Sequence, residues 1–210
     1  MAETRMIFHV EAGGEFRPVE LRFATEGEVR HVRAWRKLTP STEAAEFATL
    51  AAKRWFYYQR EGATIHSLQG LRATCKRRKE AELAFLLVAS APWAKRYKSL
   101  ALAYCRRTWC HHLVLDFLAV RPGLAFKKHP ISGTGSGILF SLTQLADRLN
   151  MHLIWGEATA SSAPFYEKVL KIRAVKDLFM IQRPMMRDIA ERYFARQQRR
   201  LAKPHRTAHT

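Results

Sequence analysis

The fold is decided by the stretch Leu113-Val-Leu-Asp-Phe-Leu-Ala-Val120, which is rich in Val, Leu and Phe and stops at Arg121-Pro122-Gly123. An apolar run that ends in such a turn is typical of a buried strand. A second strand is predicted from Met151 to Glu157, and a short helix around Phe165-Tyr-Glu-Lys168. Between the strands, Gly133-Thr-Gly-Ser-Gly137 precedes a predicted helix that runs to Asn150, because its apolar residues fall at helical spacing: Ile138, Leu139, Leu142, Leu145, Ala146 and Leu149.

The glycines of 133–137 indicate a candidate phosphate site. Glycine lets the backbone approach a ligand closely, and the unpaired N–H groups of a helix start attract negative charge. Lys127, Lys128 and His129 come shortly before. The spacing is not that of G-x-G-x-x-G, and no Lys-Ser or Lys-Thr follows as a P-loop requires. Taken alone, the glycine triplet leaves a turn or packing role open.

In combination, these segments resemble the GNAT acetyltransferase superfamily. Val120-Arg121-Pro122 is similar to the V-x-P end of the family's central strand, and Gly133-Thr134-Gly135 to its glycine pair. Pro164-Phe-Tyr-Glu-Lys168 is similar to the family's F-Y-E-K segment.

Three features depart from the family pattern. Pro130 stands where Gln or Arg is expected, Leu170-Lys171 replaces Gly-Phe, and the gap from Pro122 to the glycines is longer than usual. A second register, with Gly135 and Gly137 as the pair, places Ser132 at the Gln/Arg position. Both registers stay open.

The resemblance implies an α/β fold, with a single GNAT-type domain and a central mixed sheet that is splayed near Ala119 and flanked by helices. The implied reaction moves an acetyl group from acetyl-CoA to a primary amine. Backbone amides of 132–137 would hold the coenzyme A pyrophosphate, and Tyr166 would protonate the departing thiolate. The cofactor-binding residues implied in this way are Leu118, Ala119, Val120, Lys127, Lys128, Ser132, Gly133, Thr134, Gly135, Ser136, Gly137, Ser161 and Ser162.

Two acids lie nearest to the proposed site in the sequence. Asp116 belongs to the first strand and Glu157 ends the second. Either is a candidate to accept a proton from the acceptor amine, although strand carboxylates more often make structural hydrogen bonds. The acceptor is left open between a small molecule, a protein and an aminoacyl-tRNA.

Charge is the second unusual property of the chain. Lys and Arg number 36 against 18 Asp and Glu, for a formal net charge of +18. Such an excess favours polyanionic partners such as RNA or ribosomes, and also an anionic cofactor. The rival interpretation is therefore a nucleic-acid-binding or ribosome-associated protein that uses the same fold without catalysis. A solvated basic surface without a specific partner is the third possibility.

Cysteine usage and hydropathy predict the compartment. The three cysteines include no C-x-x-C motif, and no signal pattern stands at the N-terminus, which favours a reducing cytoplasm. The longest apolar run is too short to span a bilayer. Cys105, Cys110, His111 and His112 have poor spacing for zinc, so no metal site is predicted. Oligomeric state is not predicted.

The rest of the chain yields coarser expectations. Strands are expected at 6–10, 19–23 and 27–33, and a helix at 41–60. A strand at 81–89 is expected beside 113–120, whereas 93–104 is compatible with a helix or with a strand from 99 to 104. A late strand is expected at 179–182, and a basic helix from 188 to 203. The domain assignment is 1–187 for the GNAT-like domain, with an acceptor side at 1–80 and a cofactor core at about 81–183, and 188–210 for a basic tail.

Overall fold

The computed structural model describes residues 6–38, 43–124 and 129–201. Its strands are β1 (Met6–Ala12), β2 (Glu15–Phe23), β3 (Leu83–Ser90), β4 (Ala101–Arg107), β5 (Leu113–Val120), β6 (Ile131–Ser132), β7 (Leu153–Glu157) and β8 (Leu178–Gln182). Its helices are α1 (Glu26–Arg33), the 3-10 helix η1 (Ala34–Lys37), α2 (Glu43–Arg60), α3 (Leu68–Arg77), α4 (Thr134–Arg148), α5 (Ala163–Leu170) and α6 (Arg183–Leu201).

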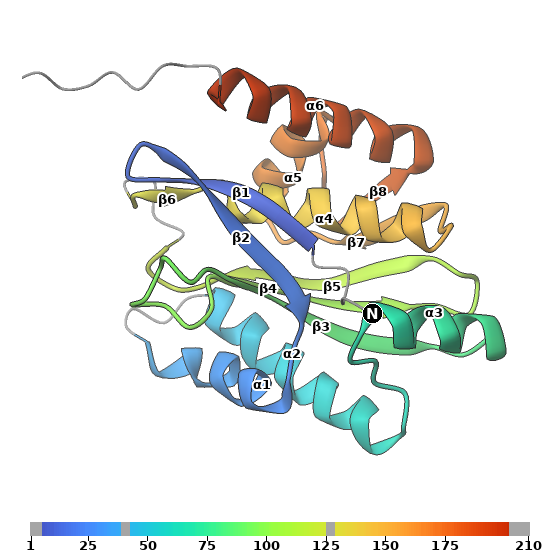
Figure 1. Ribbon diagram of the computed structural model, residues 1–210. Helices are drawn as coiled ribbons and strands as arrows, with labels where there is room; N and C mark the ends of the chain where they lie inside the picture. The colour runs from blue at the N-terminus through green and yellow to red at the C-terminus, as the bar shows by residue number, and fades with distance from the viewer. Residues whose placement is uncertain (1–5, 39–42, 125–128, 202–210) are drawn as a thin grey trace, which may run out of the picture.

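All eight strands of the described residues form one mixed sheet in the order β6-β1-β2-β3-β4-β5-β7-β8 (Figure 1). Neighbouring strands are antiparallel except β5 and β7, which are parallel and are connected through α4. A parallel pair needs such a crossover, because the chain must return to the same end of the sheet. The mixed α/β fold predicted from the sequence is confirmed.

Helices cover both faces of the sheet (Figure 1). One buried apolar cluster joins the sheet to α1, η1 and α2, with Trp35 and Trp55 as its largest side chains. The other joins it to α4, α5 and α6, and also takes in Leu68 and Leu71 of α3. β3 and β4 are buried almost throughout, since they lie in the middle of the sheet between the two layers.

The prediction of a strand at 27–33 is wrong, because this segment forms α1. Thr25 and Glu28 make a capping box, in which the Thr25 N–H donates to the Glu28 carboxylate at 3.0 Å. Val29 and Val32 are buried on one side of the helix, and their spacing of three residues suits one helical face. The alternation of apolar and basic residues therefore concealed a short amphipathic helix.

The strand predicted at 81–89 exists as β3, but its expected place beside β5 is wrong. β4 lies between them and pairs with both, Leu87 with Ala103 and Ala103 with Leu118. The ambiguous segment 93–104 therefore resolves in favour of a strand at its end. A strand there completes two successive antiparallel pairings, which a helix could not supply.

The basic C-terminal helix begins earlier than predicted and packs on the core. α6 starts at Arg183, so the division proposed between 187 and 188 falls within it. Met186 and Ile189 are buried, and the ring of Tyr193 stacks on that of Phe140 in α4 at 4.1 Å. The Tyr193 hydroxyl also donates to the carbonyl of His9 in β1 at 3.0 Å.

Candidate active site between β5 and β7

The central feature of the site is the point where β5 and β7 separate. Their pairing runs from Leu113–Ile154 to Leu115–Gly156 and stops there, although β5 continues to Val120. The β5 edge at Leu118–Val120 therefore has no strand partner on the β7 side among the described residues. This gives the sheet the splay that was expected near Ala119.

A β-bulge accompanies the separation. Tyr104 pairs with Phe117 and Cys105 with Leu115, so Asp116 is an extra residue on β5. A bulge bends its strand and increases the local twist. It also places Asp116 and Phe117 toward the α2 layer, where Arg54 of α2 contacts both of them.

α4 begins next to this opening without a side-chain cap. Its N-cap is Gly133 in the left-handed conformation (φ 93°), and no acidic residue stands in its first turn. The N–H groups of Thr134, Gly135 and Ser136 have no acceptor within the helix, whereas that of Gly137 reaches Gly133 at 2.9 Å. A Cβ at Gly133 would meet open space. Such an uncapped helix start fits an anionic group of a ligand.

The three glycines of 133–137 have different roles. A Cβ at Gly137 would lie 2.0 Å from Cδ2 of Phe8, so this glycine lets α4 pack against β1. A Cβ at Gly135 would lie 3.0 Å from Cζ of Phe165 in α5. The packing role that the sequence left open therefore applies to Gly137, while the backbone at Gly133 faces open space. Ser132 precedes the helix in β6, opposite Glu11 of β1.

Tyr166 lies in α5 with its side chain in the core. It is 4% exposed, its ring stacks on Phe179 at 4.1 Å, and Phe165 meets it edge-on at 5.1 Å. Burial, followed by the neighbouring Cys105 thiol, raises the pKa of Tyr166. The phenol therefore keeps its proton at neutral pH, as a proton donor must.

The two candidate acids have contrasting surroundings. Asp116 is 9% exposed on its side chain and accepts three hydrogen bonds: from Arg106 Nε at 2.7 Å, Arg106 Nη2 at 2.8 Å and Arg54 Nη1 at 2.9 Å. Glu157 is exposed at the end of β7 and makes no ion pair with a described residue. Both line a hollow of about 160 Å³ on the α2 side of the separation, together with Trp155.

The remaining predicted site residues are placed as follows. Ser161 donates a hydrogen bond to Glu43 at the start of α2, and Ser162 accepts one from the N–H of Thr159 at 3.0 Å. Both hydroxyls are therefore engaged within the loop between β7 and α5 or with α2. Lys127 and Lys128 lie outside the described residues.

Three further observations bear on the predicted site. Among the described residues, no group of three or more His, Cys, Asp or Glu side chains is arranged to hold a metal. Nor is any described helix long and apolar enough to cross a membrane. Sequence reasoning missed the arginines around Asp116, since Arg54 is 62 positions away and Arg106 meets Asp116 only through the bulged register of β4 and β5.

Comparison with known proteins identifies the fold. No family model and no curated protein matches the sequence. Solved structures do match. A chimera of the spermidine N-acetyltransferase SpeG from Vibrio cholerae and hSSAT is 12% identical over 81% of this chain and 98% of its own, with a TM-score of 0.51. An uncharacterized protein from Bacillus halodurans is 10% identical over 91% and 97%, with a TM-score of 0.52.

A third structure carries the family name. It comes from Desulfovibrio desulfuricans, is named for the GNAT acetyltransferase family, and is 14% identical over 78% of this chain and 98% of its own, with a TM-score of 0.49. The SpeG match shows that the chain has the fold of an N-acetyltransferase, in agreement with the GNAT resemblance of its sequence.

Proposed function

We propose that this protein transfers an acetyl group from acetyl-CoA to a primary amine. The observation that carries the proposal is the separation of β5 from β7 beside the uncapped start of α4. It leaves unpaired backbone on one strand edge and unpaired N–H groups at a helix start within one region of the fold. An extended ligand with anionic and amide groups has partners for both kinds of group there.

The chain's own groups divide the binding task. The N–H groups of Thr134, Gly135 and Ser136 would hold the pyrophosphate. Ser132 and Gly133, which immediately precede them, would border the same group. The β5 edge at Leu118–Val120 would hold the pantetheine arm and polarise the carbonyl to be attacked, as an oxyanion hole does. Bound acetyl-CoA supplies the acetyl group as a thioester.

Of the two acids, Glu157 is the better candidate base. The Asp116 carboxylate is held by two guanidinium groups, so protonating it would break three charge-assisted hydrogen bonds. Glu157 shares a hollow with Asp116 and remains exposed. Glu157 would therefore take the proton of the acceptor amine, directly or through water, while Arg54 and Arg106 fix the shape of the bulge.

Tyr166 would supply a proton to the departing sulfur. Its raised pKa keeps the phenol protonated, and its stacking on Phe179 fixes the ring. Ser161 and Ser162 would orient the cofactor arm through the loop that they stabilise. The acceptor class remains a small amine, a protein amine or an aminoacyl-tRNA.

Turnover with a panel of amines tests the proposal. Acetyl-CoA would be incubated with the protein and a polyamine, a lysine-containing peptide or an aminoacyl-tRNA, and free thiol and acetylated amine would be measured together. We expect acceptor-dependent thiol release matched by acetylated product for at least one class. Absence of product from all classes, with a folded protein that binds no coenzyme A, would refute the proposal.

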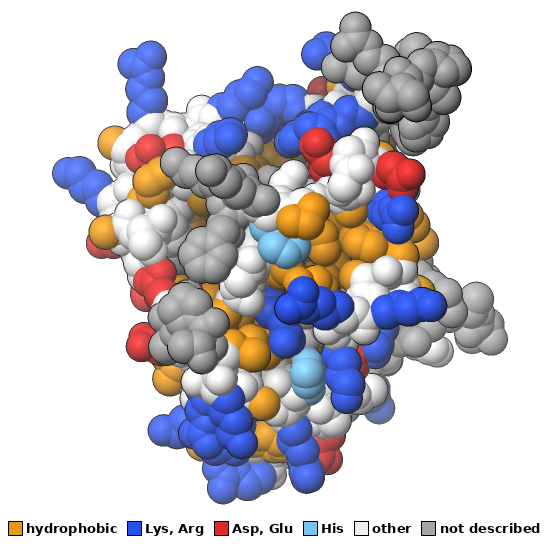
Figure 2. Space-filling model, turned by 90° about the vertical axis from the view of Figure 1, so that its left-hand side faces the viewer, with side chains coloured by type: hydrophobic (Ala, Val, Ile, Leu, Met, Phe, Trp, Pro, Cys, Tyr) orange, Lys and Arg blue, Asp and Glu red, His pale blue; other side chains and the backbone are white. Residues whose placement is uncertain are grey.

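The positive charge favours a second candidate function, binding of RNA without catalysis. Figure 2 shows Lys and Arg side chains at several places on the face at the left of Figure 1, interspersed with Asp and Glu side chains, and the whole sequence carries a net charge of +18. If these cations contact RNA phosphates, binding should weaken with salt, by about 0.7 in the log-log slope for each phosphate on a single strand. If no RNA binding can be measured even at low salt, this second candidate function is excluded.

A further inference from the structure

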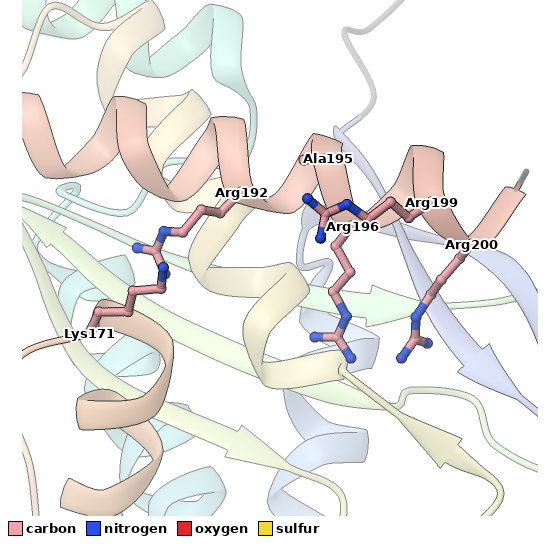
Figure 3. Close-up of a pocket in the computed structure, with 6 residues that line it drawn as sticks. All are labelled: Lys171, Arg192, Ala195, Arg196, Arg199 and Arg200. Carbon is pink, nitrogen blue, oxygen red and sulfur yellow. The ribbon is translucent and has the colours of Figure 1, made fainter.

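A hollow of about 450 Å³ lies between the C-terminal end of α5 and the C-terminal half of α6 (Figure 3). Five of the side chains that line it are cationic and one is small: Lys171, Arg192, Arg196, Arg199, Arg200 and Ala195. In the view of Figure 3, Arg196 and Arg200 point from α6 toward the junction of β6 and α4. None of these residues belongs to the candidate active site described above.

Most of this positive charge is not neutralised by the described part of the chain. Arg200 pairs with Glu11, and Arg192 Nη2 lies 2.7 Å from Asp188 Oδ2. Lys171, Arg196 and Arg199 make no ion pair with any described residue. Arg192 Nε is buried and lacks a hydrogen-bond partner within the same residues. Like charges gathered around one hollow repel one another, so an anion bound between them would be stabilised.

The hollow also lies close to the start of α4. Tyr193 of α6 stacks on Phe140 in the second turn of α4. Toward the C-terminal end of α6, Arg200 pairs with Glu11, whose strand partner Ser132 immediately precedes the Gly133 N-cap. α6 therefore runs antiparallel to α4, and its last turns approach the first turn of α4.

α5 approaches the same place from another side. Phe165 packs against Gly135, and the helix ends at Lys171, which adopts the left-handed conformation with φ 56°. The hollow is thus bordered by α5 and α6 beside the uncapped helix start. A ligand with one anionic group at α4 and another close by could engage both sites.

We propose that this hollow binds the 3′-phosphate on the ribose of coenzyme A, with Lys171, Arg196 and Arg199 as its ligands. The inference rests on the proposed function and extends it to this part of the cofactor. Coenzyme A carries its diphosphate and this phosphate monoester on the same nucleoside, so a diphosphate at α4 brings the monoester near α6. A monoester is doubly charged near neutral pH and suits a concave cluster of cations. RNA backbones are instead tracked by cations along a groove.

Calorimetry with two natural forms of the cofactor tests the proposal. Coenzyme A and 3′-dephospho-coenzyme A differ only in the proposed ligand group. For the wild-type protein we expect coenzyme A to bind at least about tenfold more tightly, because a charged hydrogen bond typically contributes that much. In the Arg196→Ala/Arg199→Ala double variant, both forms should bind alike and close to the wild-type affinity for the dephospho form.

The matched control is Arg187→Ala, which removes an exposed charge from α6 outside the hollow. It should retain the preference for coenzyme A. Equal binding of both forms by the wild-type protein, or an unchanged preference in the double variant, would overturn the proposal while leaving acetyl transfer intact. Failure of both forms to bind would instead overturn the proposed function. Loss of RNA binding in the double variant with unchanged cofactor preference would assign the hollow to RNA and overturn the inference.

Discussion

Gly137→Ala should destabilise the protein although alanine favours helices. The added Cβ would lie 2.0 Å from Cδ2, 2.5 Å from Cε2 and 2.7 Å from Cγ of Phe8. Phe8 is fully buried in β1, so its ring cannot swing into solvent. Relieving the overlap requires α4 and β1 to move apart, and overpacking of this kind costs about 1–3 kcal/mol. Replacing glycine within a helix gains about 1 kcal/mol, which leaves a net destabilisation of up to about 2 kcal/mol.

The matched control is Gly27→Ala in α1, where a Cβ would meet no atom within 4 Å. That variant should be unchanged or more stable by up to about 1 kcal/mol, because only the helix propensity changes. Urea unfolding followed by circular dichroism gives both free energies of unfolding. If Gly137→Ala were as stable as Gly27→Ala, the contact between α4 and β1 would not be as close as the structure shows.

Three further predictions concern catalysis and pH. Tyr166→Phe should reduce acetyl transfer by about 100-fold to 10,000-fold, because it removes only the donated proton. Steady-state kinetics would show this loss, and calorimetry should show little change in coenzyme A affinity. Undiminished turnover would exclude Tyr166 as the acid. Glu157→Gln should mainly reduce turnover, whereas Asp116→Asn should mainly lower the melting temperature; the reverse pattern would reassign the base. Burial lowers the pKa of His9, whose Nδ1 must be unprotonated to accept a hydrogen bond from Gln197 Nε2 at 2.9 Å. The resulting stabilisation is present above the unfolded pKa of about 6.5 and is lost as the pH falls through the folded pKa. The melting temperature of the wild-type protein should therefore drop more between pH 7.5 and pH 5 than that of His9→Phe. Equal drops in the two proteins would contradict this.

The sequence predicted the strands and helices best where local patterns and tertiary contacts agree. The run at 113–120 and the helix after the glycines form as expected, since both are apolar enough to be buried in any arrangement. The segment 27–33 was mistaken for a strand, although its two valines are three positions apart, which places them on one face of a helix and on opposite faces of a strand. The capping box of Thr25 and Glu28 marks the start of that helix. The place of β3 could not be read, since it depends on a pairing across the sheet.

The sequence allowed the backbone elements of the candidate site to be predicted, but not the side-chain contacts between them. The order of strand, glycines and helix gave the location of the helix start and of Tyr166. Local sequence contains no sign that two arginines hold Asp116, because the bulge and the approach of α2 create that contact. For the same reason the role of Gly137 became clear only with Phe8 beside it.

Binding of acetyl-CoA tests the central claim most directly. Native mass spectrometry of the folded protein mixed with acetyl-CoA, and separately with ATP as a phosphate-bearing control, reports the mass and number of bound molecules. We expect one acetyl-CoA per chain, retained in preference to ATP, and loss of acetyl from the bound species when a suitable amine is added. Equal or no retention of the two ligands by folded protein would contradict an acetyl-CoA site between β5 and β7.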